Sequence, residues 1–184
     1  EVLTYGSFMN SWGPGPELAK RFEEKYQIAV SFQDGGDGAL LLERLKIRKA
    51  DVVVGLDQFS VQEAAKQFKW ERLQGTTARF ARDEFYAFDW APMAFIYRDK
   101  EIVPPESMDD LLSSRFRGQI ALQDPRISSP GQQFLFWVFA QKGFPMSEKG
   151  DGARGFLTQL APNIQSISSS WAQAYGLFQS GHAK

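Results

Sequence analysis

The chain has 184 residues, of which 43% are hydrophobic and 23% are charged, a balance typical of a folded globular protein and not of a disordered or fibrous one. Its net charge of −1 gives no overall field for nucleic acid or an anionic membrane. No apolar run approaches the roughly 20 residues that span a bilayer. The chain has no cysteine and a single histidine, His182. This composition excludes disulfides and cysteine nucleophiles, and it argues against a Ser-His-Asp triad or a multi-histidine metal centre.

The first half of the chain alternates strand and helix patterns. Strands are predicted at residues 2–5, 28–32 and 51–56, and helices are predicted from Pro16 onward, at 39–49 and at 61–68. Because the order is β-α-β-α-β-α, it predicts an α/β fold with a mostly parallel sheet flanked by helices. Residues 51–56 are largely apolar, which is typical of a strand covered on both faces.

Residues 85–97 are aromatic and mostly extended, with an interruption at Pro92, and we expect them to cross between two lobes. The remaining elements are predicted as a capped helix beginning at 107–110, a strand at 118–122, helices at 132–141 and 150–160, a strand at 164–167 and a helix at 171–178. The predicted domains are a first lobe at 1–88, a hinge crossover at 89–98 and an incomplete second lobe at 99–184.

The two ends of the sequence also bear on whether the chain is part of a longer polypeptide. Residue 1 leads directly into a strand with no visible signal peptide, so any leader is either removed or absent. The chain stops just after a βα unit, where another strand is expected. This abrupt end predicts a fragment of a longer polypeptide, with a naturally short protein as the alternative.

Ligands of open α/β sheets bind beyond the carboxyl ends of the strands, so the loops that follow strands hold the candidate residues. Tyr5 and Trp12 lie in a Gly/Pro-rich stretch and suit stacking or attraction of a cation, although Trp12 could also cover its own loop. Asp37 precedes a helix and is either a helix cap or an acceptor for an aminopyrimidine or guanidinium group. Asp57 follows the third strand, where a plain cap is the simpler interpretation.

Hydroxyl residues mark two helix starts in the second half. Ser128 and Ser129 precede Pro130, at a position where free backbone N–H groups and the helix dipole favour an anion or phosphate. The chain has no Walker sequence. Residues 168–170 are three serines before Trp171 and repeat the arrangement. Capping alone would explain either cluster, but the two together favour a polar recognition surface.

Several segments, taken in order along the chain, resemble the thiamine-binding members of the periplasmic substrate-binding protein family, which serve bacterial ABC importers. They are residues 5–8, 12–16, 50–57, 123–126, 129–131, 171 and 174–178. The resemblance implies a two-lobed Venus-flytrap fold in the periplasm that holds thiamine or thiamine phosphate in the cleft. It implies delivery to a membrane permease, with no cofactor, no metal and no catalysis.

The resemblance also assigns roles to particular residues. It implies that Tyr5 and Trp12 shape the pocket and that Asp37 binds the pyrimidine end of the ligand. It implies that Ser128 and Ser129 receive the phosphate or hydroxyethyl end of the ligand. Trp171 matches the tryptophan of the family's late helix. Ile127 stands where the family usually has a hydroxyl residue, which predicts weaker phosphate contacts.

Other functions stay open at this point. A binder of a polyamine or of ferric iron on the same fold is one alternative. A thiamine-processing enzyme is another, although thiamine-cleaving enzymes of this fold use a cysteine nucleophile and the chain has none. The family continues well past Lys184, so a dimer that compensates for the missing part is a further expectation.

Overall fold

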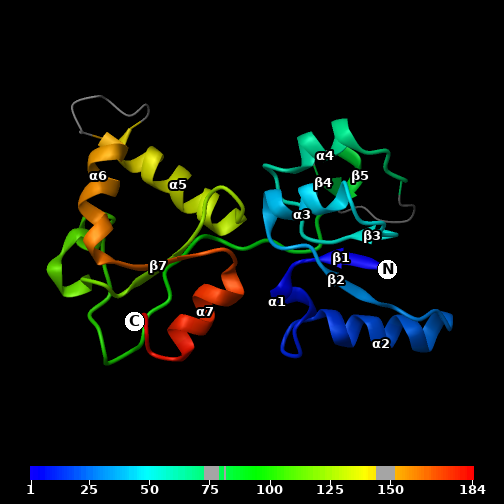
Figure 1. The fold of residues 1–184 in the computed structure, drawn as a ribbon, viewed down its shortest axis with the longest axis horizontal. Coiled ribbons are helices and arrows are strands. Elements are labelled where there is room, and N and C mark those ends of the chain that lie inside the picture. Colours follow the sequence, from blue (N-terminus) through cyan, green and yellow to red (C-terminus); the bar gives the residue numbers. More distant parts are fainter. Residues whose placement is uncertain (73–78, 81, 144–151) are drawn as a thin grey trace. The chain divides into compact units, whose positions relative to one another are not determined.

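The computed structural model describes residues 1–72, 79–80, 82–143 and 152–184 (Figure 1). The chain divides into two compact units, Glu1–Pro92 and Met93–Lys184. The division falls inside the segment 89–98 that the sequence assigns to a crossover, and the role of this segment as a hinge stays a prediction. Across the described residues, none of the helices has the length and apolar character needed to cross a membrane.

The first unit is built on a three-stranded parallel sheet with the order β2-β1-β3, which confirms the predicted parallel arrangement. Its strands are β1 (Val2–Thr4), β2 (Phe32–Asp34) and β3 (Val52–Val53). Helices α1 (Gly6–Met9) and α2 (Gly15–Tyr26) lie on one side of this sheet, and α3 (Gly38–Leu45) and α4 (Val61–Gln67) on the other (Figure 1). An antiparallel pair, β4 (Arg79–Phe80) and β5 (Arg82–Tyr86), completes the unit.

Two strands of the first unit differ from the prediction. The second begins at Phe32, four residues later than expected, and the third is only two residues long. Val52 is 51% exposed, so the expectation of a strand covered on both faces is wrong. The reason is its position, since β3 is the edge strand of the described sheet, next to β1, and Val52 borders an open groove.

The second unit contains a parallel pair, β6 (Ile120–Gln123) and β7 (Ile164–Ser168). Helices α5 (Ser129–Lys142) and α6 (Gly152–Leu160) lie on one side of the pair and α7 (Trp171–Gln179) lies on the other (Figure 1). The helix expected from 107 is a 3-10 turn, Asp109–Leu112. Two more such turns span Ser114–Phe116 and Ala161–Asn163. Residues 150 and 151, where the helix before Leu160 is predicted to begin, lie outside the described residues.

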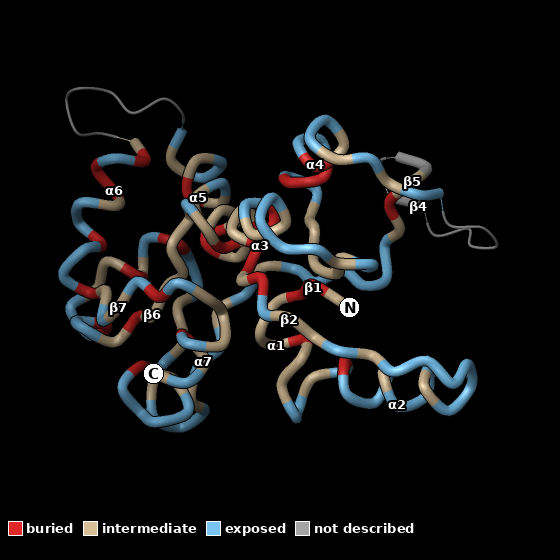
Figure 2. The backbone as a smooth tube through the Cα atoms, turned by 45° about the vertical axis from the view of Figure 1, so that its right-hand side comes forward, coloured by how far each residue is buried: buried red, intermediate tan, exposed pale blue. Residues whose placement is uncertain are grey.

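The buried residues are distributed unevenly along the chain (Figure 2). The core of the second unit joins α5, α6, β6 and the segment with the first two 3-10 turns, and it consists of Met108, Leu111, Phe116, Ile120, Phe134, Val138, Ala153, Phe156 and Leu160. The corresponding cluster in the first unit consists of Leu42, Val61, Ala64 and Phe85. The second core also accommodates a buried amide, because Asn163 Nδ2 donates to the carbonyl oxygens of Leu111 at 2.7 Å and Ser113 at 2.9 Å.

Candidate functional site

Three of the candidate loops meet at one edge of the first unit's sheet. Because β1, β2 and β3 are parallel, their carboxyl ends point to the same edge. Tyr5 follows β1, Asp37 follows β2 and Asp57 follows β3. Backbone hydrogen bonds extend the sheet toward this edge, from Gly35 N to the Thr4 oxygen at 2.6 Å and from Val54 N to the Leu3 oxygen at 3.0 Å. The topology therefore places these three predicted residues on neighbouring loops.

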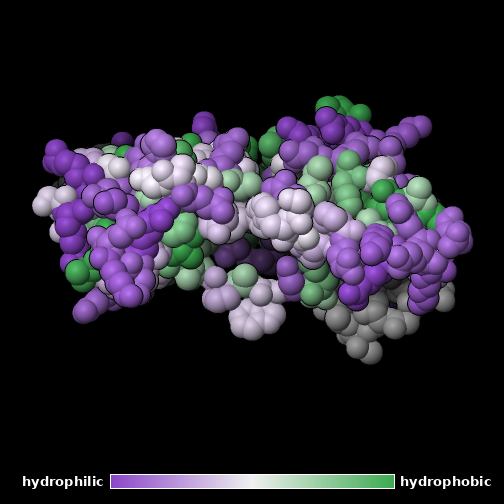
Figure 3. Space-filling view, turned by 90° about the horizontal axis from the view of Figure 1, so that it is seen from below, coloured by the Kyte–Doolittle hydropathy of each residue, from purple (hydrophilic) through white to green (hydrophobic). Residues whose placement is uncertain are grey.

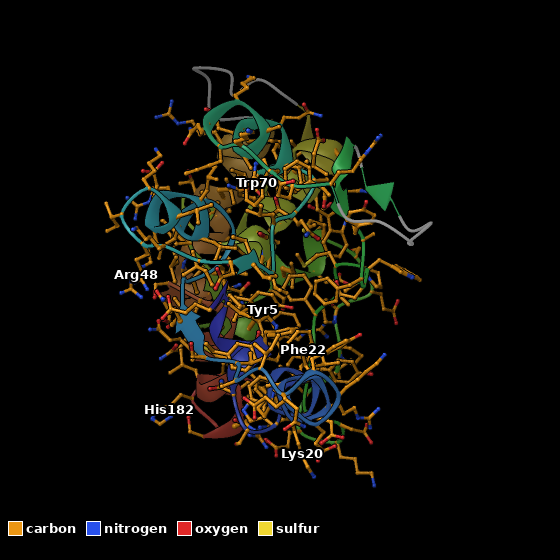
Figure 4. The ribbon with its side chains drawn as sticks, turned by 90° about the vertical axis from the view of Figure 1, so that its right-hand side faces the viewer. Tyr5, Lys20, Phe22, Arg48, Trp70 and His182 are labelled. Carbon is orange, nitrogen blue, oxygen red and sulfur yellow. The ribbon has the colours of Figure 1, made fainter. Side chains whose placement is uncertain are left out.

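Tyr5 lies against a glycine that admits no side chain. A Cβ atom built on Gly55 would lie 2.3 Å from Cδ1 of Tyr5, and the φ of Gly55 is +112°, a conformation that favours glycine. On another side, Phe8 makes an edge contact with the Tyr5 ring at a centroid distance of 5.8 Å. The ring is thereby held between the third loop of the sheet and α1, and it is half-buried (Figure 4).

The surroundings of Tyr5 raise the pKa of its phenol. Burial of the side chain is the largest cause that raises the pKa of Tyr5 to about 12, and the negative charges of Asp89 and Asp37 contribute in the same direction. The phenol therefore remains a hydrogen-bond donor at neutral pH, next to two acidic side chains. A neutral aromatic ring beside carboxylates is an environment that favours a cation.

Asp37 does not act as the helix cap that its position suggested. It is only 8% exposed and occupies the residue before α3, but its side chain makes no capping hydrogen bond to that helix. The capping interpretation is therefore wrong for this carboxylate. Its charge instead acts on the phenol of Tyr5.

Asp57 lies in the turn that leads into α4, whose N-cap residue is Ser60, so its side chain fixes this turn and the interpretation as a plain helix cap is wrong. Its Oδ1 accepts hydrogen bonds from the backbone N–H of Phe59 at 3.0 Å and of Ser60 at 2.9 Å, and from Oγ of Ser60 at 2.8 Å. No described group donates to its buried Oδ2. A role in ligand binding for this second oxygen stays a prediction.

Trp12 lies in the connection between α1 and α2 and is 57% exposed. Gly13 shapes that connection, because a Cβ atom at Gly13 would lie 2.2 Å from the carbonyl oxygen of Ser7. With more than half of its surface in solvent, the indole is not a core residue. This location agrees with its predicted contact with a ligand, which stays a prediction.

Asp89 is a residue of this edge that the sequence analysis missed. It is exposed and belongs to the segment that follows β5, next to Phe88, whose ring contacts Phe8 edge-on at a centroid distance of 6.0 Å. This contact brings the segment toward Tyr5, whose pKa Asp89 raises. The available signal was a single acidic residue within an aromatic run.

The second unit places its two serine clusters at one edge. Gln123 of β6 pairs with Ser168 of β7, and the backbone N–H of Asp124 donates to the Ser168 oxygen at 2.8 Å. The loops after both strands therefore begin side by side. Gly131 lets α5 start directly on the end of β6, since a Cβ atom there would lie 2.5 Å from the Gln123 oxygen.

The serines at these two helix starts are used differently. Ser128 is fully buried before α5 and its side chain makes no capping hydrogen bond to the helix, whereas Ser129 is the first residue of α5. Ser170 caps α7, since its Oγ accepts a hydrogen bond from the N–H of Gln173 at 3.3 Å. Trp171 is the first residue of α7 and lies at the same sheet edge as Ser128. The structure thus brings Ser128, Ser129 and Trp171 to one edge of the second unit.

An apolar groove in the first unit lies apart from these residues. It has a volume of about 440 Å³ and is lined mainly by α2, residues 28–32 and β3, with Leu18, Phe22 and Val52 among its side chains. Figure 4 shows Phe22 on the side of α2 that faces the sheet and Lys20 on the opposite side. Hydrophobic side chains reach the surface of this unit on the right of Figure 3. None of the predicted ligand residues lines the groove.

Among the described side chains, no group of three or more His, Cys, Asp or Glu residues is arranged to hold a metal ion.

Known proteins with similar sequences and with similar structures belong to the same class, the solute-binding proteins. The family described as bacterial extracellular solute-binding protein matches residues 13–184. The chain is 33% identical over 193 residues to a thiamine-binding periplasmic protein of Brucella abortus, covering 99% of this chain and 56% of that protein. It is 34% identical over 194 residues to the thiamine-binding periplasmic protein of Escherichia coli, covering 99% of this chain and 57% of that protein.

Solved structures agree with these relatives. A periplasmic thiamin binding protein has a TM-score of 0.79 and 30% sequence identity, covering all of this chain and 59% of that one. The periplasmic binding protein P5PA, at 21% identity and a TM-score of 0.69, shows the fold alone. The predicted periplasmic-binding-protein fold class is confirmed, and the chain spans somewhat more than half the length of the relatives that it matches.

Proposed function

This chain belongs to the family of bacterial extracellular solute-binding proteins, and we propose that it binds thiamine. It serves in this proposal as the substrate-binding component of an ABC importer in the periplasm, passes its ligand to a membrane permease and catalyses no reaction. The printed names of the relatives support the ligand class and the compartment. The residues that meet at the sheet edge of the first unit support the ligand on chemical grounds.

The observation that carries the proposal is the position of Tyr5 and Asp37 after adjacent parallel strands at one sheet edge, where the charges of Asp37 and Asp89 act on the phenol of Tyr5. Thiamine contains a thiazolium cation and an aminopyrimidine ring. Carboxylates and aromatic rings stabilise the cation, by about 0.5–2 kcal/mol for each cation–π contact. The carboxylate of Asp37, only 8% exposed, is suited to accept a hydrogen bond from the exocyclic amine.

We propose further that phosphate esters of thiamine are ligands. Ser128 and Ser129 stand at the amino end of the 14-residue helix α5, where backbone N–H groups and the helix dipole favour a phosphate. Ile127 provides no hydroxyl group at this edge, so we expect the ester to gain little affinity over thiamine itself. In this proposal residues of both units contact one ligand in an interlobe cleft, and segment 89–98 acts as the hinge.

Calorimetric titration with thiamine and with thiamine phosphate tests the proposal. Asp37→Asn removes one charge and one strong acceptor, and we expect it to weaken thiamine binding roughly 10- to 100-fold, as the loss of a charged hydrogen bond implies. Trp12→Ala is expected to weaken binding at least threefold. Asp51→Asn is the matched control, because Asp51 lies at the amino end of β3 and pairs with the N-terminal amine at 2.6 Å.

Equal affinity of the wild-type chain and both site variants would reject this ligand site. Competition with spermidine and with ferric ion separates thiamine from the alternative ligands that the sequence left open. Stronger binding of either competitor than of thiamine would replace the proposed ligand. Native mass spectrometry of the same samples shows the subunit count and any ligand retained through purification.

A further inference from the structure

Helix α7 carries a row of three aromatic rings along one face. Trp171, Tyr175 and Phe178 are spaced four and three residues apart, the spacing that aligns side chains on a helix. The ring centroids of Trp171 and Tyr175 are 4.7 Å apart with an interplanar angle of 16°, and those of Tyr175 and Phe178 are 6.1 Å apart at 23°. The three rings therefore form a near-parallel stack. By contrast, Phe95 and Phe134 in the same unit meet edge-on at 84°.

An arginine fixes the far end of this stack. The guanidinium carbon of Arg98 lies 4.9 Å from the centroid of the Phe178 ring. Nη2 of Arg98 donates to the carbonyl oxygen of Phe178 and, at 3.0 Å, to that of Gln179. These are the last residues of α7, where carbonyl groups lack partners within the helix and a cation is favourable.

The near end of the helix is fixed independently. Oγ of Ser170 caps the first turn through the N–H of Gln173, at 3.3 Å. The helix is only nine residues long, so constraints at both ends define its rotation and the direction of its side chains. Trp171 is the first residue of the helix, so no preceding helical turn packs against its side chain. The ring of Tyr175 supplies that support from the following turn.

We infer that Tyr175 is a positioning residue, whose stacked ring holds the indole of Trp171 at the angle in which it meets the ligand. This inference rests on the proposed function, because it takes Trp171 to be a ligand contact. Phe178 and Arg98 extend the same support to the end of the helix. The ring of Tyr175, and not its hydroxyl group, performs this role.

A double-mutant cycle on thiamine affinity, measured by calorimetry, tests the inference. We expect Tyr175→Leu to weaken binding roughly three- to tenfold, the scale of one aromatic pair, and Tyr175→Phe to bind like the wild type. Trp171→Ala is expected to weaken binding more, and adding Tyr175→Leu to it is expected to have no further effect. Phe136→Leu is the matched control, because Phe136 is an aromatic residue of the same unit that is 49% exposed on α5.

The near-ultraviolet circular dichroism of the same variants reports the stack without a ligand. The signal that Trp171→Ala removes is expected to be lost in Tyr175→Leu and kept in Tyr175→Phe. Wild-type affinity in Tyr175→Leu, or additive losses in the double variant, would overturn the inference while leaving the ligand assignment intact. Wild-type affinity in Trp171→Ala would remove Trp171 from the ligand site and would overturn the inference as well, because an indole that does not meet the ligand has no binding angle for Tyr175 to hold.

Discussion

Among the described residues, the core of the second unit joins nine buried residues from two helices, a strand and the segment with the first two 3-10 turns, whereas the cluster around α3, α4 and β5 in the first unit has four. The first unit also leaves open an apolar groove of about 440 Å³. The candidate residues of the second unit therefore stand on a packed interior. Those of the first also depend on backbone geometry, above all on the conformation of Gly55 against the Tyr5 ring. Similar loops at the ends of parallel strands are thus supported by different means.

A large core truncation gives the strongest test of this contrast. Leu160 is 1% exposed within the second core, so Leu160→Ala is expected to lower the free energy of unfolding by about 2–5 kcal/mol through lost burial and the cavity left behind. Leu18→Ala, at a groove residue that is 53% exposed, is expected to change it by less than about 1 kcal/mol. Urea unfolding followed by circular dichroism measures both. Equal losses would show that the groove face is as firmly packed as the core.

Glycine replacements test the backbone support of the first unit. Gly55→Ala meets both an unfavourable φ of +112° and the Tyr5 ring, and we expect a loss of about 2–3 kcal/mol together with weaker thiamine binding. Gly118→Ala in the second unit is the matched control, because its φ is +62° and nothing lies within 4 Å of the added Cβ. Only the conformational cost of about 1–2 kcal/mol is expected there. A Gly55→Ala variant that keeps full affinity would show that Tyr5 does not need this contact.

Tyr5 of the first unit and Asp124 of the second are expected to respond differently to pH and salt. The pKa of Tyr5, about 12, is raised mainly by burial, so folding loses stability between pH 10 and 12, where only the unfolded phenol ionises. The pKa of Asp124, about 2, is lowered by hydrogen bonds from Arg126, so its contribution to stability is present above pH 4 and is lost toward pH 2.

In 1 M NaCl we expect the shift of Asp124 to shrink, because the Arg126 side chain is exposed and screening is strong, while that of Tyr5 persists. Tyrosinate absorbance, with Tyr5→Phe as reference, and carboxyl NMR titration of Asp124 measure these shifts. A salt-sensitive Tyr5, or an Asp124 that does not respond to salt, would reverse the assigned causes.

Much of the fold followed from the sequence, because the alternation of strand and helix patterns predicts parallel pairing whatever the exact strand bounds. The second strand was misplaced because residues 28–30 are apolar for another reason, since they line the groove. A hydrophobic run therefore does not show whether its side chains are buried in a sheet or line an open groove, as the exposed Ile28 does. The same ambiguity produced the expectation of a covered strand around Val52.

The sequence predicts the position of a site residue where the order of strands and helices alone determines it. Tyr5 and Asp37 follow adjacent parallel strands, so their proximity follows from the chain order. Asp89 reaches the same edge from a segment without periodicity, and nothing in its neighbourhood along the sequence indicates Tyr5 as its neighbour. The role of Asp37 could not be predicted either. The side chain of a residue before a helix can cap that helix or point away from it, and the sequence is the same in both cases.

The open apolar groove has a practical consequence for handling the protein. Detergents and other amphiphiles carried through purification will meet a surface that matches their hydrocarbon tails. Dyes that fluoresce in apolar surroundings will bind the folded chain before any heating begins. Melting curves are therefore better followed by the intrinsic emission of the five tryptophans, in detergent-free buffer.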